Sequence, residues 1–318
     1  MTASMRIVFV GESLIDFTAA SGLVFQGHEG GALTNSAVAC ARLGQPTGFV
    51  TQLSTDLFGE RLLDYLQGNG IDTRFVLRSD APSTLAFVER TSSSNRYAFY
   101  MQGTAGTLWS PAELPLLPAS CRWLHFGSIA LLQEPAATRI TEFVQAQRGQ
   151  RMVLFDPNAR PSLIADPLSW RKRCEQWFAA ADVVKMSDED AALLAPGRGL
   201  ADVAADCLRL GPRAIVITRG GEGATLYRPG AAPLEVASPP IKVADTIGAG
   251  DTFAAGLSVA LLERGVEDAG ALAALSSECW RDVLKFATAA AAINCMREGA
   301  NPPHRVEVDA LLAHGSNA

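Results

Sequence analysis

The segment at 245–251, with the sequence DTIGAGD, combines small residues and carboxylates at a spacing suited to phosphate chemistry. It lies between an alternating apolar run, Ile241 and Val243, and a long helical pattern that begins at Thr252. Small residues at 248–250 let successive backbone N–H groups converge, and the following helix directs the positive end of its dipole at the same point. Strand, glycine turn and helix together predict an anion site.

Asp251 has two interpretations in this setting. It could cap the helix that follows the turn, as acidic residues at helix starts do. Alternatively, it could accept a proton from a hydroxyl group while the backbone N–H groups hold a phosphoryl group. A carboxylate serves no purpose in a pocket that only binds phosphate, so the flanking Asp245-Thr246 and the rest of the chain favour the second interpretation.

A second glycine cluster, Gly30 and Gly31, precedes a helical pattern that carries Asn35 in its first turn. Adjacent glycines permit close approach of the backbone to a ligand, and an asparagine side chain offers both a donor and an acceptor, as a polyol requires. Upstream, Asp16 follows the first apolar run, in the region where open α/β sheets bind ligands. A flexible turn and solvated polar residues remain the alternative explanation for each feature taken alone.

The elements that must position these residues alternate along the chain. Apolar runs typical of buried strands occur at 6–10, 48–53, 123–126, 152–155, 183–185 and 214–218. Helical patterns occur at 33–43, 58–67, 134–147, 188–194, 252–264 and 278–296. This alternation predicts an α/β fold with a mostly parallel sheet and helices on both faces, in a single domain that spans 1–318.

One segment breaks the alternation. Residues 84–90 and 96–101 alternate in polarity around a Ser/Asn-rich turn at 91–95, a pattern that predicts a β-hairpin. We expect the hairpin to form a small antiparallel flap with part of 16–26, rather than a simple edge of the main sheet. The flap would then comprise segments at roughly 16–30 and 74–104.

The composition argues against several classes of partner and of site. The 318 residues carry a net charge of −6, which argues against a nucleic-acid or anionic-membrane partner. The six cysteines have no C-x-x-C spacing and the four histidines have no metal-ligand spacing, so neither a disulfide framework nor a zinc site is expected. No apolar run reaches membrane-spanning length, and the N-terminus leads into a strand instead of a signal peptide. We therefore expect a cytoplasmic protein.

With these motifs in view, the chain resembles the ribokinase-like (pfkB) carbohydrate kinase family over essentially its whole length, and its fructokinase-like members in particular. Two signatures carry the resemblance: Gly30-Gly31 with Asn35 and the run at 41–44, and the segment at 245–251. The sequence contains no Walker A loop and no G-x-G-x-x-G fingerprint after the first strand, which argues against a P-loop protein and a dinucleotide-dependent oxidoreductase. The resemblance implies a three-layer α/β/α fold with a β-sheet lid, and ATP-dependent phosphorylation of a sugar or a related alcohol.

The matching positions imply roles for individual residues. Asp251 would be the base that takes the proton of the acceptor hydroxyl. The anion hole would consist of Gly248, Ala249 and Gly250. The residues expected to hold sugar hydroxyls are Asp16, Gly30, Gly31 and Asn35. Arg160 belongs to a D-P-N-x-R run that resembles fructokinase-like and ketodeoxygluconate-kinase-like members, and it would face the substrate or the phosphates.

For the nucleotide, the resemblance implies binding residues at Lys185, Ser187, Thr218, Gly220, Gly223 and Asn294. Ser187 and Asp190 stand where the family often has an Asn-x-x-Glu stretch that organises Mg²⁺ through water. Both keep oxygen ligands, so an indirect, water-mediated role of Asp190 toward the metal is expected. ATP and Mg²⁺ are the implied cofactors, together with a monovalent cation such as K⁺ as a further expectation.

The lid sequence bears on the acceptor. Relatives that take sugar acids tend to carry an arginine after an aromatic pair, whereas here Phe99-Tyr100 is followed by Met101-Gln102, which argues against a carboxylate-bearing sugar acid. A neutral sugar is therefore expected, most simply fructose phosphorylated on its 6-hydroxyl. The alternatives are 2-keto-3-deoxygluconate, ribose, tagatose phosphate or a nucleoside as acceptor, and a sugar-sensing protein without catalysis. Apolar strand faces in such a lid pair between subunits, so we also expect a homodimer through the lid.

Overall fold

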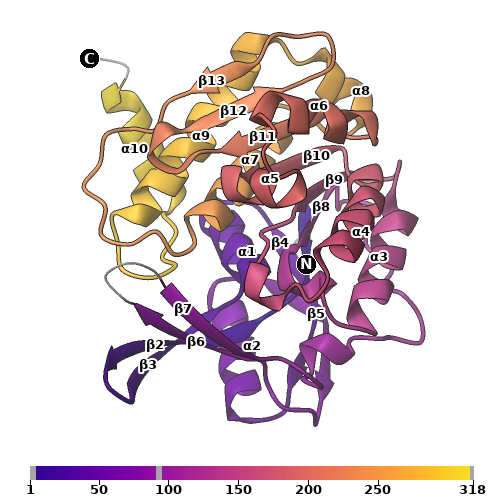
Figure 1. Ribbon diagram of the computed structural model, residues 1–318, viewed down its shortest axis with the longest axis vertical. Coiled ribbons are helices and arrows are strands. Elements are labelled where there is room, and N and C mark those ends of the chain that lie inside the picture. Colours follow the sequence, from indigo (N-terminus) through magenta and orange to yellow (C-terminus); the bar gives the residue numbers. More distant parts are fainter. Residues whose placement is uncertain (1–4, 91–94, 316–318) are drawn as a thin grey trace.

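A computed structural model describes residues 5–90 and 95–315 of the chain (Figure 1). A nine-stranded sheet has the order β13–β12–β11–β10–β9–β8–β1–β4–β5. Its strands are β1 (Ile7–Val10), β4 (Thr47–Ser54), β5 (Asp72–Ser79), β8 (Trp123–Gly127), β9 (Met152–Asp156), β10 (Val183–Ser187), β11 (Ala214–Thr218), β12 (Ala224–Tyr227) and β13 (Leu234–Val236). All neighbours from β5 to β11 pair in parallel, and β12 and β13 extend the sheet in antiparallel fashion.

Helices cover both faces of this sheet (Figure 1). They are α1 (Ala32–Arg42), α2 (Leu57–Gly68), α3 (Ala136–Gln147), α4 (Pro167–Ala180), α5 (Asp188–Leu194), α6 (Leu200–Arg209), α7 (Ala249–Glu263), α8 (Ala269–Ala274), α9 (Ser277–Cys295) and α10 (Arg305–Gly315). The predicted α/β class is thus confirmed, and each predicted strand and helix is present. None of the helices in the described ranges is long and apolar enough to cross a membrane.

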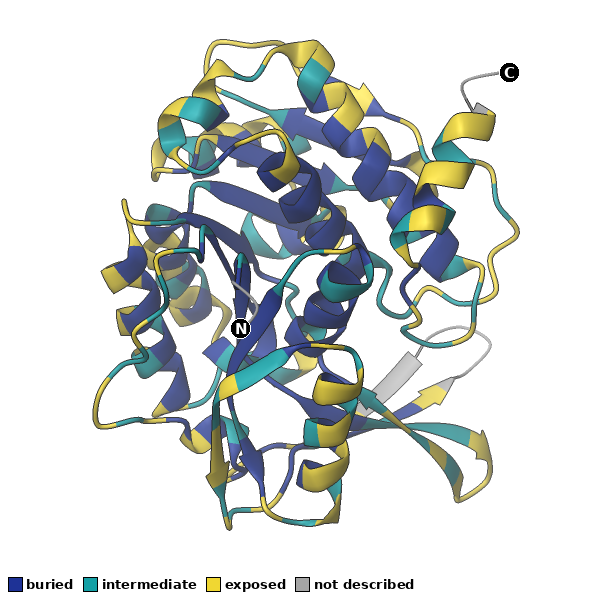
Figure 2. Ribbon diagram, turned by 180° about the vertical axis from the view of Figure 1, so that it is seen from behind, coloured by how far each residue is buried: buried dark blue, intermediate teal, exposed yellow. Residues whose placement is uncertain are grey.

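Strand β1 shows why the sheet is buried on both faces. Its side chains alternate between the two sides, so that Ile7 and Phe9 join one apolar core and Val8 and Val10 join the other. The first core is closed by α1, α2, α7 and α9, and the second by α3, α4 and α6. Figure 2 shows the resulting dark interior between two helical layers. This three-layer packing holds the carboxyl ends of the parallel strands, and the loops that follow them, in fixed positions.

A second, four-stranded sheet has the order β3–β2–β6–β7. Its strands are β2 (Leu14–Ser21), β3 (Val24–Gly30), β6 (Leu85–Arg90) and β7 (Asn95–Tyr100). It projects from one side of the large sheet (Figure 1), and β2 and β6 pair in parallel at its centre. The predicted hairpin corresponds to β6 and β7, while most of its predicted turn, 91–94, lies outside the described residues.

The boundary expected for the second flap segment, 74–104, differs from the structure. Residues 74–79 belong to β5, which pairs in parallel with β4 at the edge of the large sheet. Because an edge strand is only half covered, β5 lacks the continuous apolar run by which a buried strand is detected from sequence. The small sheet also does not consist of antiparallel pairs alone, because β2 and β6 run in the same direction.

Candidate active site

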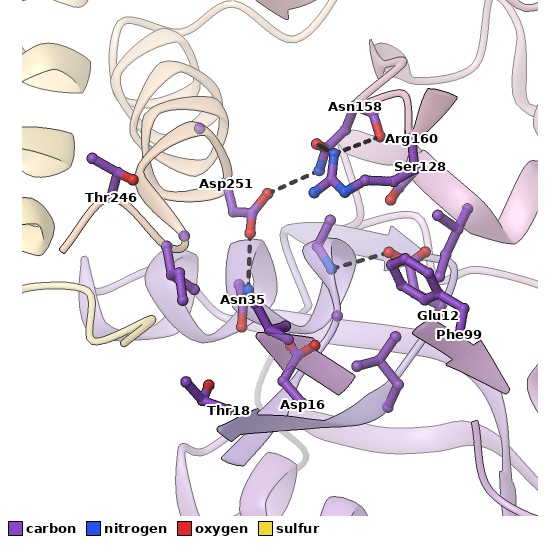
Figure 3. Close-up of a pocket in the computed structure, with 18 residues that line it drawn as sticks. Glu12, Asp16, Thr18, Asn35, Phe99, Ser128, Asn158, Arg160, Thr246 and Asp251 are labelled. Carbon is purple, nitrogen blue, oxygen red and sulfur yellow. Dashed lines mark hydrogen bonds between the residues drawn. The ribbon is translucent and has the colours of Figure 1, made fainter. Parts of the chain in front are cut away.

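A cavity of about 260 Å³ lies between the large sheet and the small sheet (Figure 3). Its wall is contributed by the loop after β1, by β2, β6 and β7, by the loop after β9, and by the N-terminal ends of α1 and α7. The lining residues predicted from the sequence are Asp16, Gly31, Asn35, Arg160, Gly248, Gly250 and Asp251. The fold therefore gathers residues from both signature motifs, which are more than 200 positions apart in the chain, around one cavity.

Asp251 lies in the first turn of α7 and is buried at the wall of the cavity. Its Oδ2 accepts a hydrogen bond from Asn35 Nδ2 at 2.9 Å, and its Oδ1 accepts one from Asn158 Nδ2 at 3.2 Å. Figure 3 shows the carboxylate between these two amides. Its backbone carbonyl accepts a third bond, from Ser36 Oγ at 3.0 Å. The carboxyl group is therefore held in one orientation by α1 and by the loop after β9.

Opposing effects act on the pKa of Asp251, and the net result is a rise. Burial raises its pKa above the ordinary value, while the hydrogen bond from Asn35 and the positive charges of Lys185 and Arg160 oppose the rise. Gly248, which precedes α7, has a φ of 75°, in the left-handed region that glycine adopts without strain. Of the N–H groups that follow it, Ala249 donates to the Thr246 carbonyl at 3.2 Å and Thr252 donates to the Gly248 carbonyl at 2.9 Å. Those of Gly250 and Asp251 lie in the first turn of the helix, where N–H groups have no carbonyl partner within the helix and can bind an anion.

Asp16 lies on β2 on the other side of the cavity from Asp251. A side chain at position 30 would place its Cβ 2.4 Å from Asp16 Oδ2, so the glycine at that position makes room for the carboxylate. Burial raises the pKa of Asp16 to about 6, with a further rise from Asp251 and an opposing effect from Arg160. Gly30 thus shapes the cavity through Asp16 without lining it directly.

A second cavity, of about 520 Å³, lies on the other side of the glycine turn. Three residues predicted for nucleotide binding line it: Thr218, Gly220 and Gly223. Ala249 lines it as well, and its other wall comes from 238–243 and from α7 and α9. Thr246 and Gly250 line both cavities, so the two spaces meet at the turn between Asp245 and Asp251.

Lys185, Ser187 and Asn294 are not among the described residues that line the second cavity. Lys185 is buried on β10, where its Nζ lies 2.9 Å from Asp156 Oδ2. Asn294 is fully buried on α9, and its Nδ2 donates to the Ile247 carbonyl at 2.8 Å. The Asn294 contact supports the glycine turn directly, and Lys185 lies next to the turn, since a Cβ added at Gly250 would lie 3.0 Å from Lys185 Nζ.

Ser187 and Asp190 form a capping box at the start of α5. Asp190 Oδ2 accepts bonds from the N–H and the Oγ of Ser187 at 2.9 and 2.8 Å, while Oδ1 accepts one from the Ala159 N–H at 2.8 Å. Both carboxylate oxygens are thus engaged within the protein, which accounts for a structural role and leaves a water-mediated metal role as a prediction. The described residues contain no group of three or more acidic, histidine or cysteine side chains that could hold a metal.

Sequence reasoning missed several residues of the site. Asn158, with a φ of 37°, orients Asp251 and also accepts a bond from Arg160 Nη1 at 2.6 Å through its Oδ1. Asp156 pairs with Lys185, and Glu12 lines the cavity beside Ser128. The D-P-N-x-R run contained a signal for the first two, because polar residues directly after a buried strand lie at the ligand-binding edge of the sheet.

The comparisons with known proteins agree with this geometry. The family model for pfkB family carbohydrate kinases matches residues 5–306, so the chain belongs to the pfkB carbohydrate kinase family. A fructokinase of Rhizobium leguminosarum bv. trifolii is 38% identical over 259 residues, which cover 80% of this chain and 79% of that protein. A probable fructokinase-3 of Arabidopsis thaliana is 32% identical, over 96% of this chain and 90% of its own length.

Solved structures show the same likeness. A fructokinase of Xylella fastidiosa with bound ATP superposes with a TM-score of 0.87 at 29% identity, covering 98% of this chain and 99% of that one. An aminoimidazole riboside kinase of Salmonella enterica, in complex with aminoimidazole riboside and an ATP analogue, gives a TM-score of 0.83 at 25% identity, over 96% of this chain and 100% of that chain. Family membership makes this protein an ATP-dependent carbohydrate kinase, as its sequence signatures predict.

Proposed function

We propose that this carbohydrate kinase is a fructokinase, which transfers the γ-phosphate of ATP to the 6-hydroxyl of fructose. The observation that carries the proposal is the meeting of two cavities at Thr246 and Gly250, with Asp251 facing the smaller one. A sugar in the smaller cavity and ATP in the larger one would bring an acceptor hydroxyl and a γ-phosphate to opposite sides of one glycine turn. Phosphoryl transfer requires this proximity and charge stabilisation above all else.

Asp251 would act as the base. It accepts the proton of the sugar hydroxyl, and the oxygen then attacks the γ-phosphorus while the bond to the ADP oxygen breaks. Because Asn35 and Asn158 donate to its two oxygens, the carboxyl group is held ready as an acceptor. The N–H groups of Gly248, Ala249 and Gly250 would hold the transferring phosphoryl group at the positive end of α7.

The acceptor would bind to Asp16, Asn35 and the backbone at Gly30 and Gly31. Arg160 also lines the cavity, and it would balance the carboxylates or contact the phosphates. The small sheet forms the remaining wall through β2, β6 and β7. We propose that it serves as a lid, which excludes water and thereby limits hydrolysis of ATP.

On the nucleotide side, Thr218, Gly220 and Gly223 would contact ATP directly. Lys185 and Asn294 would act on it through the glycine turn that they support. Ser187 and Asp190 would contribute through the start of α5. The chemistry of the donor set fits Mg²⁺ that enters on the nucleotide, because this metal keeps several waters and takes substrate phosphates as ligands instead of requiring a protein cage. When bound, Mg²⁺ neutralises charge on the β- and γ-phosphates; a K⁺ requirement remains a further proposal.

The size and charge of the smaller cavity favour a neutral hexose. Its volume of about 260 Å³ lies below the range of about 300–1,000 Å³ that is usual for larger ligands. Arg160 is the cation among the described lining residues, against the carboxyl groups of Glu12, Asp16 and Asp251, which disfavours sugar acids and sugar phosphates. A nucleoside is the second candidate, because Phe99 lines the cavity and could stack on a base, and because of the likeness to the riboside kinase.

The proposal is tested by measuring ADP production with ATP and a panel of acceptors. Fructose is expected to give the highest kcat/KM, ahead of glucose, ribose, 2-keto-3-deoxygluconate, tagatose phosphate and nucleosides. A higher kcat/KM for a nucleoside would replace fructose with the second candidate. Absence of turnover with every acceptor would favour a sugar-sensing protein.

We also propose that the protein forms a homodimer through the lid. The outer face of the lid carries an aromatic cluster in which Phe87 stacks on Phe17 at 4.9 Å and meets Phe25 at 5.2 Å between ring centroids. Next to it, Leu23 and Tyr100 are 93% and 63% exposed, as expected for an apolar surface that a partner covers. Sedimentation equilibrium should give a dimer, and Leu23→Asp should shift it to monomer. A monomeric wild-type protein at micromolar concentration would contradict this proposal.

A further inference from the structure

Glu12 is a buried acid at the wall of the sugar cavity. It lies in the short loop between β1 and β2, is 6% exposed, and lines the same cavity as Asp16 and Asp251 (Figure 3). Its Oε1 accepts a hydrogen bond from the Ala32 N–H at 3.0 Å, and its backbone carbonyl accepts one from Thr34 Oγ1 at 3.2 Å. These contacts to the start of α1 fix the position of the carboxyl group.

The other carboxyl oxygen, Oε2, has no hydrogen-bond partner among the described residues. A buried polar atom left without a partner costs about 1–3 kcal/mol, so its presence in a native structure calls for an explanation. Glu12 lines the cavity but Oε2 itself is closed off from solvent, so a molecule bound in the cavity supplies the missing partner once the wall shifts to expose this oxygen. Beside it, Ser128 has a φ of 60°, and such backbone strain in a residue other than glycine is concentrated at ligand sites.

The charges of the neighbouring groups favour the protonated form of the Glu12 carboxyl group over the ionised form. The charged and titratable groups on and behind this wall are Asp16, His125, Asp156, Arg160, Lys185 and Asp251. Lys185 is paired with Asp156, which leaves Arg160 to balance the carboxylates of the cavity. An ionised Glu12 would add a further negative charge where a polyphosphate must also approach, and this disfavours the ionised form.

Burial acts in the same direction. It raises the pKa of Glu12 to about 7, and the charge of Asp251 contributes to the rise, while the donor groups nearby, on its own backbone, Ser128 and Ala32, act against it. The neutral form is therefore present at and below neutral pH. A protonated carboxyl group is a hydrogen-bond donor as well as an acceptor, whereas a carboxylate only accepts.

We propose that Glu12 is a further acceptor-binding residue, whose protonated carboxyl group donates a hydrogen bond from Oε2 to a hydroxyl oxygen of the neutral sugar. The inference rests on the proposed function, because it assigns the smaller cavity to the sugar. Glu12 thereby differs from Asp16, which accepts from the sugar when ionised. Sugar binding requires Glu12 to carry its proton, so the contribution of Glu12 to the affinity is full below pH 7 and falls as the pH rises through the pKa of this group.

The test is calorimetric titration of the full-length protein with fructose at pH 6 and pH 8, each in two buffers of different ionisation enthalpy. The Kd for fructose should rise about fivefold between these two pH values, because the loss of the Glu12 proton outweighs the ionisation of Asp16, and binding at pH 8 should take up close to one proton. Glu12→Gln keeps an acceptor for the Ala32 N–H and a donor at the other position. We expect this variant to lose both the rise in Kd between pH 6 and pH 8 and the proton uptake at pH 8; the titration of Asp16, with a pKa of about 6, should then leave its Kd slightly lower at pH 8 than at pH 6.

Ser13→Ala is the matched control, since Ser13 is the buried neighbour of Glu12 and is not among the described residues lining the cavity. It should keep the proton uptake of the wild type. Uptake that persists in Glu12→Gln, or a wild-type Kd that is equal at pH 6 and pH 8, overturns the assignment. If the circular dichroism spectrum shows that Glu12→Gln is unfolded, the proton uptake of the wild type at pH 8 decides whether the assignment of Glu12 holds. Failure of the wild type to phosphorylate fructose is a separate result, which overturns the proposed function itself.

Discussion

Lys185 of the buried Lys185–Asp156 pair lowers the pKa of Asp251, and removing the two partners separately should move the pH dependence of catalysis in opposite directions. The two side chains are 4% and 6% exposed and lie 2.9 Å apart. Although burial lowers the pKa of Lys185, the carboxylates Asp156, Asp190 and Asp251 raise it above the ordinary value, so the ammonium is charged at working pH. An opposite charge at close range shifts a carboxyl pKa by about 1–3 units.

As the proposed base, Asp251 would act only when ionised, so activity is expected to appear as the pH rises through its pKa. Lys185→Met removes the cation that opposes the raised pKa of Asp251, and the acid limb of kcat should move up by about one pH unit. Asp156→Asn leaves the ammonium uncompensated, and the acid limb should move down. The measurement is kcat against pH from 5 to 9, with saturating fructose and ATP.

Stability provides the second readout of the same pair. Removing one partner of a buried ion pair costs about 3–5 kcal/mol in the free energy of unfolding, whereas Lys185→Met combined with Asp156→Asn should recover most of that loss. Lys172→Met, at an exposed position on α4, is the control and should change stability by less than about 0.5 kcal/mol. Acid limbs that move in the same direction, or do not move, would refute an electrostatic role for the pair.

Three further predictions concern the proposed site. Asp251→Asn should lower kcat by about 10²–10⁴ with little change in fructose affinity, and near-normal turnover would remove Asp251 as the base. Asp16→Ala should raise the KM for fructose strongly at similar kcat, because a polar cavity loses a hydrogen-bond partner of the sugar, and an unchanged KM would remove Asp16 from the acceptor site. Chelation of divalent cations should abolish ADP production and leave the thermal midpoint of the nucleotide-free protein unchanged, whereas a lowered midpoint would indicate a metal bound by the protein itself.

The main sheet could be predicted because its inner strands are buried on both faces. β1, β8 and β9 consist of fully buried residues, and such continuous apolar runs stand out from the amphipathic helices between them. The strands at the rim could not be found in this way. β3 alternates between exposed and half-covered residues and contains two glycines, and β5 carries polar residues along a half-exposed edge.

The residues of the site also differ in how well the sequence could place them. Asp251, Gly248 and Asn35 stand in motifs whose spacing has few other uses, so their presence at one cavity could be anticipated. Lys185 and Asn294 could be located near the nucleotide but not oriented, because the sequence does not tell whether a buried side chain points into a cavity or supports the turn behind it. Glu12 gave no signal, since a lone acid in a loop has many uses until its burial is known.

The placement of charge explains why buried ions are tolerated at this point of the fold. Lys185 lies next to the glycine turn and is paired with Asp156, so the turn gains a nearby positive charge without an unpaired ion in the core. The loop that begins directly after Asp156, at the end of β9, supplies Asn158 to Asp251 and Arg160 to the cavity. The end of β9 and the loop after it thus influence both the charge and the orientation of the proposed base. A substitution of Asp156 should therefore change the pH dependence of kcat more than it changes the KM for the sugar.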